Sequence, residues 1–153
     1  MPEIVLVHPE IPANTGNIAR TCVATHTPLH LIEPLGFSLS DKYMKRAGLD
    51  YWPRLQLQVW SSLEHFMESM EGRRFFLASS KGKQSVYETT FADGDLLFFG
   101  SETKGLPAAF QQLYPEKSLR IPMFPGERCL NLSNSVAVVL YEALRQQGFP
   151  QLQ

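Results

Sequence analysis

Three short segments contain more glycine, asparagine, proline and charge than a simple connection between elements requires. They are residues 14–20 (Asn-Thr-Gly-Asn-Ile-Ala-Arg), residues 100–107 (Gly-Ser-Glu-Thr-Lys-Gly-Leu-Pro) and residues 121–135. The second and third each follow a predicted strand, and in open α/β sheets ligands bind at the carboxyl ends of strands. Glycine, which has no side chain, lets backbone groups approach a ligand closely. We therefore treat the three segments as the candidate functional site.

Each segment also has a structural explanation when it is taken alone. A turn capped by Asn14 explains the first segment, and an arginine such as Arg20 is usually solvated or ion-paired. A strand-to-helix turn with Glu102 at the positive end of a helix explains residues 100–105 equally well. A helix cap explains one polar residue of 131–135, but that segment has four. The local patterns alone leave structural and binding roles open.

Two common nucleotide-binding motifs are excluded by the residues present. Residues 100–105 have the G-x-x-x-x-G spacing of a phosphate loop, but Leu106 and Pro107 occupy the positions of its lysine and its serine or threonine. The G-x-G-x-x-G pattern of dinucleotide-binding proteins is absent from the sequence. We therefore predict neither a nucleoside triphosphatase nor an ordinary dinucleotide-binding enzyme.

The histidines and cysteines indicate neither a metal site nor a catalytic triad. The chain has four histidines: His8, His26, His30 and His65. Their spacing fits no such site, so we expect them at the surface or at strand ends. Cys22 and Cys129 form no C-x-x-C pair, which argues against zinc and against a disulfide framework. Cys129 lies in the third segment, but no histidine stands near it in sequence, so a nucleophilic role is the less favoured interpretation.

Length and composition predict one compact domain that covers residues 1–153. The chain is 44% apolar and has a net charge of −1. It therefore has neither an acidic disordered tail nor a globally basic surface, and any polyanion must bind to a local patch. The amino-terminal segment lacks the basic region of a secretory signal, and the apolar runs are too short to span a bilayer. We expect a cytoplasmic protein.

The hydrophobic pattern predicts an α/β domain with a mostly parallel sheet. The predicted strands are residues 4–7, 29–32, 55–60, 74–79, 95–99 and 119–121. Helices are predicted after Asn14, after a capping box at residues 61–64, and from about Ser133 to Gly148. In the first of these, Ile18, Cys22 and Val23 form the buried side, whereas Arg20 points away from them.

Taken together, the segments resemble the three signature motifs of a known family. "NTGNIAR", "FFGSETKGLP" and "IPM…RCLNLSNSVAVVLYEA" resemble those of SPOUT-class, S-adenosylmethionine-dependent RNA 2′-O-ribose methyltransferases. With "EIPANTGNIAR", "KRAGLDYW" and "DGDLLFFGSETKGLP", the resemblance runs from end to end to the small tRNA (cytidine/uridine) 2′-O-methyltransferases of the TrmL/YibK type. It implies a mostly parallel sheet with helices on both faces and a C-terminal deep trefoil knot, an exception to the rule that chains are unknotted.

The resemblance also implies the cofactor, the reaction and their residues. S-adenosylmethionine would bind at the knot and leave as S-adenosylhomocysteine, with no metal required. Its expected contacts are Ala78, Ser79, Gly100, Ser101, Glu102, Gly105, Ile121, Met123, Cys129 and Leu130. The expected catalytic residues are Arg20, Asn14, Glu102, Asn131 and Ser133. Arg20 would position the ribose or its phosphate rather than act as a simple base, because a guanidinium stays protonated. Many relatives have serine in place of Cys129.

The implied substrate is the wobble nucleotide, cytidine or modified uridine, of tRNA, with leucine tRNAs as the expected set. The candidate RNA-binding residues are Arg20, Lys42, Lys45, Arg46, Tyr51 and Arg128, and other basic residues are Arg54, Lys81, Lys83 and Lys104. The resemblance implies a homodimer in which Arg20 reaches the partner's cofactor. An interface and an internal core explain Ile18, Val23, Val139, Leu140 and Ala143 equally well. Methylation of another tRNA or rRNA position, and a non-catalytic RNA-binding or cofactor-binding module, remain as alternatives.

Overall fold

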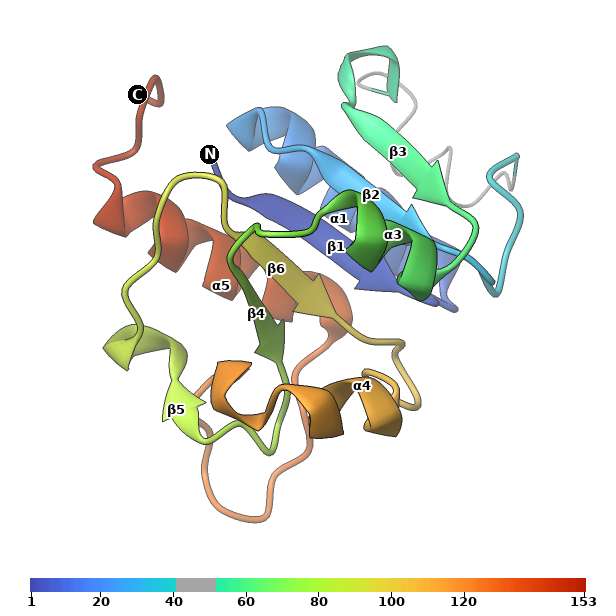
Figure 1. The fold of residues 1–153 in the computed structure, drawn as a ribbon. Helices are drawn as coiled ribbons and strands as arrows, with labels where there is room; N and C mark the ends of the chain where they lie inside the picture. Colours follow the sequence, from blue (N-terminus) through green and yellow to red (C-terminus); the bar gives the residue numbers. More distant parts are fainter. Residues whose placement is uncertain (41–51) are drawn as a thin grey trace.

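The computed structural model describes residues 1–40 and 52–153, in which strands alternate with helices (Figure 1). The strands are β1 (Glu3–Val7), β2 (Leu29–Ile32), β3 (Leu57–Trp60), β4 (Phe75–Ala78), β5 (Gln84–Ser85), β6 (Leu96–Phe99) and β7 (Ser118–Arg120). The α-helices are α1 (Pro12–Thr25), α3 (Leu63–Ser69), α4 (Ala108–Leu113) and α5 (Leu132–Gln146). Short 3-10 turns are η1 (Trp52–Arg54), η2 (Val86–Glu88) and η3 (Pro115–Lys117). None of the helices described is long and apolar enough to cross a membrane.

The strands of the described residues form one parallel sheet in the order β3-β2-β1-β6-β4-β7-β5. Strand β1 lies inside it, and Ile4 is paired with Leu29 of β2 and with Leu97 of β6. Four of the five residues of β1 are buried, as is typical of a parallel sheet whose two faces are both covered.

Helices cover both faces of the sheet, as Figure 1 shows. Because side chains alternate along a strand, Ile4 and Leu6 pack on one face and Val5 and Val7 on the other. The first face packs against α1 and α5, which also contact each other, and the second packs against α3 and α4. The expected α/β class, with a mostly parallel sheet and helices on both faces, is confirmed.

Strand β7 enters the sheet between β4 and β5, although β4 and β5 are close together in sequence. The connection between these two strands lies directly on β7: a Cβ at Gly82 would lie 2.3 Å from the carbonyl carbon of Leu119. Arg120 fastens the same connection, because its Nη1 donates to the Lys83 carbonyl oxygen at 2.9 Å. The chain that leads to α5 is therefore threaded past this connection.

The predicted elements match the structure closely, with three informative errors. Strand β5 and helix α4 are not among the predicted elements, because two and six residues are too few for a clear periodic pattern. Helix α1 begins at Pro12 with Ile11 as its N-cap residue, so the prediction that Asn14 caps this helix is wrong. Proline suits the first position of a helix because it needs no N–H partner there. Since Asn14 lies inside the helix and does not cap it, its side chain is available for another contact.

The interface interpretation of the α1 and α5 side chains is also wrong for most of them. Ile18, Leu140 and Ala143 are fully buried within the chain, and Val139 is 2% exposed. Only Val23 is half-buried. These residues form the core between the two helices and the sheet, so a second copy of the chain would have to contact other side chains.

Candidate functional site

The segments predicted to bind the cofactor meet at one edge of the sheet. Strands β6, β4 and β7 are neighbours and run parallel, so their carboxyl ends lie side by side. Ala78 ends β4 and Ser79 follows it, residues 100–105 follow β6, and residues 121–130 follow β7. The Ser79 N–H donates to the Leu119 carbonyl at 2.8 Å, which ties the first of these segments to β7.

Residues 101–105 form a closed turn. The Ser101 N–H donates to the Gly105 carbonyl at 3.2 Å, and the Gly105 N–H donates to the Ser101 carbonyl at 2.9 Å. A Cβ at Gly100 would lie 2.0 Å from the Gly105 carbonyl carbon. The space beside Gly100 is therefore occupied by the turn itself, so the absence of a side chain at this position allows the turn to close on its own backbone.

The segment after β7 offers apolar surface beside polar backbone. Ile121 and Met123 are half-buried, Leu130 is 40% exposed and Phe124 is 85% exposed. An adenosine group needs flat apolar packing and a few hydrogen bonds at its edges, so these residues fit the expected cofactor. Cys129 is also exposed.

Asn14 and Asn131 join the first and third segments. The Asn131 Nδ2 donates to the Asn14 Oδ1 at 3.1 Å. The Asn131 Oδ1 accepts from the Ser133 backbone N–H at 2.9 Å and from the Ser133 Oγ at 2.6 Å. Asn131 therefore caps α5 and holds the buried Asn14 with the same amide group. A helix cap together with a cross-link to α1 explains Asn14, Asn131 and Ser133 better than a helix cap alone.

Glu102 joins the second segment to the start of α1. Its two carboxylate oxygens accept from the Glu10 N–H at 3.0 and 3.2 Å, and one of them also accepts from the Ile11 N–H. Glu102 therefore does lie at the positive end of a helix, as its structural interpretation predicts. The helix is α1, however, and not the one that follows Glu102 in sequence.

Glu10 and Thr103 belong to the same contact and were missed by sequence reasoning. The Thr103 Oγ1 donates to the Glu10 carboxylate at 2.7 and 2.9 Å. Hydrogen bonds, the strongest from Thr103, lower the pKa of the exposed Glu10 carboxyl below its ordinary value. The two residues are 93 positions apart, and nothing in their local patterns indicates that they meet.

Arg20 is exposed on α1. It lies about 12 Å along the helix from Pro12, because each residue adds about 1.5 Å. The exposed basic residues of the three edge loops are Lys81, Lys83, Lys104 and Arg128. The other predicted RNA contacts, Lys42, Lys45, Arg46 and Tyr51, lie outside the described residues.

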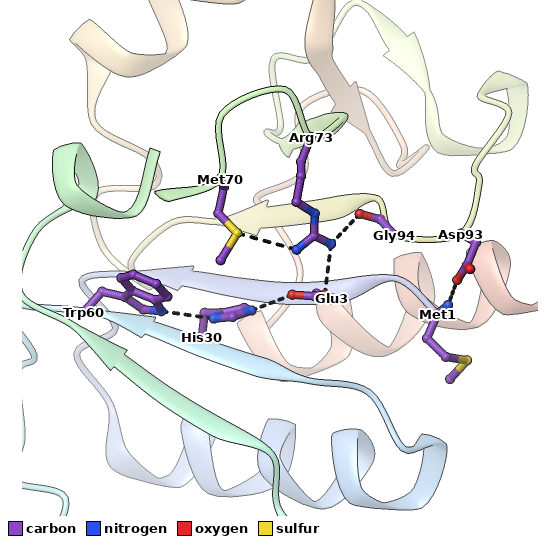
Figure 2. A network of polar contacts seen from close by, with 8 residues as sticks. All are labelled: Met1, Glu3, His30, Trp60, Met70, Arg73, Asp93 and Gly94. Carbon is purple, nitrogen blue, oxygen red and sulfur yellow. Dashed lines mark hydrogen bonds and ion pairs between the residues drawn. The ribbon is translucent and has the colours of Figure 1, made fainter. Parts of the chain in front are cut away.

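The remaining polar chemistry lies away from this edge. His30 is 3% exposed inside β2, so the expectation that it lies at the surface or at a strand end is wrong. Its ring joins Glu3 and Trp60 in the network of Figure 2.

Burial raises the pKa of the Cys22 thiol to about 12, which leaves no reactive thiolate there. A cavity of about 1050 Å³ lies near Met1, at the opposite edge of the sheet. Within residues 1–40 and 52–153, no three His, Cys, Asp or Glu residues gather as metal ligands would.

Comparisons with known proteins agree with this geometry. The model of the SpoU rRNA Methylase family matches residues 1–141. A tRNA (cytidine(34)-2'-O)-methyltransferase of Methylovorus glucosotrophus (strain SIP3-4) is 51% identical over 148 residues, with 96% of each chain covered. A structure solved for the 2-OH methylation of C/U34 on tRNA is 48% identical, with a TM-score of 0.93 and 97% of each chain covered.

A third comparison extends the similarity to a cofactor complex. The SpoU methyltransferase AviRb from Streptomyces viridochromogenes, solved in complex with AdoMet, is 25% identical with a TM-score of 0.86. The match covers 96% of this chain and 57% of that one. The threading of β7 and α5 is thus the deep trefoil knot of SPOUT methyltransferases. From its sequence motifs, its fold and these matches, the chain belongs to the SpoU rRNA methylase family.

Proposed function

We propose that this protein transfers the methyl group of S-adenosylmethionine to the ribose 2′-hydroxyl of tRNA nucleotide 34, the wobble position. The observation that carries the proposal is the meeting of three separate segments, through Asn14, Glu102 and Asn131, at the carboxyl edge of the sheet. The names of relatives that are about half identical over almost their whole length support the choice of position 34.

S-adenosylmethionine, when bound, supplies a methyl group attached to a sulfonium sulfur. The proposed cofactor contacts are Ala78, Ser79, Gly100, Ser101, Glu102, Gly105, Ile121, Met123, Cys129 and Leu130. The loops after β4 and β6 would contact the cofactor through backbone groups, and the segment after β7 offers half-exposed apolar side chains. An in-line displacement depends mainly on alignment, so the rigid turn at residues 101–105 and its attachment to α1 suit the reaction.

Arg20 is proposed to hold the target ribose or its phosphate. Its guanidinium remains protonated, so it would stabilise and orient the 2′-hydroxyl rather than remove the proton. Because Arg20 lies about 12 Å along α1 from the edge where the loops meet, we propose that it serves the site of a second copy in a homodimer. Asn14 and Asn131, supported by Ser133, would brace the loops of the site from within one chain.

The proposed substrate is a single-stranded anticodon loop, which exposes both ribose and base to a small domain. Exposed Lys81, Lys83, Lys104 and Arg128 would bind phosphates beside the cofactor. We further propose that the target nucleotide is cytidine or modified uridine, at the wobble position of leucine tRNAs in the cytoplasm.

The test is transfer of labelled methyl from S-adenosylmethionine to unmodified total tRNA, followed by nuclease mapping of the product. A 2′-O-methylated nucleotide at position 34 is expected. Methylation of another tRNA position would keep the chemistry and contradict the substrate. Cofactor binding without transfer to tRNA or rRNA would instead indicate a non-catalytic module.

A further inference from the structure

Two glutamates form a reciprocal contact at the carboxyl edge of the sheet. The Glu102 carboxylate accepts from the backbone N–H groups of Glu10 and Ile11. The Glu10 carboxylate in turn accepts from the Oγ1 of Thr103, next to Glu102 in sequence. Each segment therefore binds the carboxylate of the other. We call Glu10, Glu102 and Thr103 the clasp.

A third loop supports the clasp from the opposite side. The Gly36 N–H, in the segment after β2, donates to the Pro9 carbonyl at 2.9 Å. A Cβ at Gly36 would lie 2.7 Å from the Cα of Glu10, so the two backbones are in direct contact. Strands β2, β1 and β6 are neighbours in the sheet, and the segments that follow them meet at Glu10. The backbone of Glu10 therefore cannot move toward β2.

The clasp connects two parts of the candidate site, the turn at residues 101–105 and the start of α1, which are far apart in sequence. The turn at residues 101–105 is closed by its own backbone hydrogen bonds, so it moves as a unit. Glu102 holds it to the start of α1, and the bond from Thr103 to Glu10 adds a second attachment point. Two separate attachments fix the orientation of the turn, whereas one would leave it able to rotate.

We propose that Glu10 is a positioning residue for methyl transfer: with Thr103, it fixes the cofactor turn relative to the start of helix α1, where Asn14 braces the third segment of the same site. The inference rests on the proposed function, because that function assigns the turn to the cofactor. A displacement of about 1 Å between reacting groups is sufficient to slow an aligned transfer strongly.

The test compares Glu10→Ala, Thr103→Val and the double variant in methyl transfer to tRNA. Each single variant is expected to lower kcat about tenfold, with a change of only a few degrees in melting temperature because Glu10 is half-buried and Thr103 is exposed. The double variant should be no slower than the slower single variant, because both changes remove the same contact. Glu10→Gln keeps a carbonyl oxygen for Thr103 and should recover most of the rate. An unchanged kcat in the single variants, or losses that multiply in the double variant, would overturn the proposal.

Matched controls are Glu68→Ala on α3 and Thr90→Val before β6, which alter exposed residues of the same two types away from the clasp. Amide hydrogen exchange needs no substrate, so it tests the clasp even where the proposed function fails. If the wild-type protein methylates no tRNA, Thr103→Val should still speed exchange at the Glu10 and Ile11 amides, whereas Thr90→Val should not. Unchanged exchange at these amides in Thr103→Val would overturn the clasp itself.

Discussion

Two polar clusters of this molecule differ in what they connect. In the network of Figure 2, Trp60 Nε1 donates to His30 Nδ1 at 3.0 Å, and His30 Nε2 lies 2.7 Å from Glu3. Because an indole N–H can only donate, Nδ1 of His30 carries no proton and Nε2 donates to Glu3. Arg73 completes the network, with its Nη2 donating to Glu3 at 2.9 Å and to the Gly94 carbonyl at 2.6 Å. These contacts join strands and connections of the sheet.

The cluster at the carboxyl edge is built differently. Its contacts, between Asn131 and Asn14 and between Glu102 and Glu10, join loops and helix starts rather than strands, and Asn131 is exposed. The His30 ring, by contrast, has its two nitrogens occupied inside the fold. The buried network therefore ties together strands of the fold, and we propose that the edge cluster holds its segments in position for the cofactor. Substitutions should therefore separate stability from activity.

The largest effect on activity is expected from Arg20→Ala. Loss of a charged group that orients the reacting hydroxyl should slow methyl transfer by about 10²- to 10³-fold. Because Arg20 is exposed, the free energy of unfolding should change by about 1 kcal/mol or less. Methyl incorporation into tRNA and thermal unfolding measure the two effects. Arg20→Lys keeps the positive charge without the forked geometry of the guanidinium. Transfer at the wild-type rate in Arg20→Ala would contradict the proposed role of Arg20.

The largest effect on stability is expected from His30→Ala. The change leaves the Trp60 N–H and one Glu3 oxygen without their partner and opens a cavity beside Phe66, at a cost of about 3 kcal/mol. For a chain of this size, the melting temperature should fall by roughly 6–12 °C. The control is His65→Ala, which alters an exposed histidine beside the same Trp60 ring. An unchanged melting temperature in His30→Ala would show that the network is not a stabilising unit.

The contrast between the clusters also explains what the sequence could predict. Periodicity reports burial along the chain, so the strands around Ile4 and Leu29 and the helix after Asn131 are placed within one or two residues. It does not report which distant residues meet. The bond of Glu102 to Glu10 spans 92 positions, and the bond of Asn131 to Asn14 spans 117. For the same reason, the threading of the chain could be expected only from the family resemblance.

An intermediate effect, divided between rate and stability, is expected from Asn131. Asn131→Ala removes both the helix cap and the bond to Asn14, so it should cost about 1 kcal/mol of stability and slow transfer about tenfold. Asn131→Ser keeps a capping oxygen but is too short to reach Asn14. It should therefore retain the stability and lose the rate. Equal rates for Asn131→Ser and the wild-type protein would show that only the cap matters.

A smaller effect concerns acid stability and Glu3. Burial raises the pKa of its carboxyl, but hydrogen bonds from His30 and Arg73 outweigh burial and lower the pKa from 4.5 to about 2. The stabilisation is therefore complete above pH 4.5 and is lost as the pH falls toward 2. Glu3→Gln should be less stable than the wild-type protein by about 1 kcal/mol at neutral pH, after solvent screening is allowed for. Denaturant unfolding at several pH values should show this difference closing below pH 4.5, and a difference independent of pH would contradict the charge as its origin.

The smallest effect is expected from Cys129→Ser, although this residue lies in the segment that follows β7. Cys129 is exposed, and a thiol is a weak hydrogen-bond donor, so its side chain should add little to the proposed cofactor site, in which we expect backbone groups to make the contacts. The affinity for S-adenosylhomocysteine, measured by calorimetry, should therefore change by about twofold or less. A tenfold gain would instead show that a hydroxyl at this position bonds the cofactor directly, and that the edge loops select their ligand by side chains as well as by backbone.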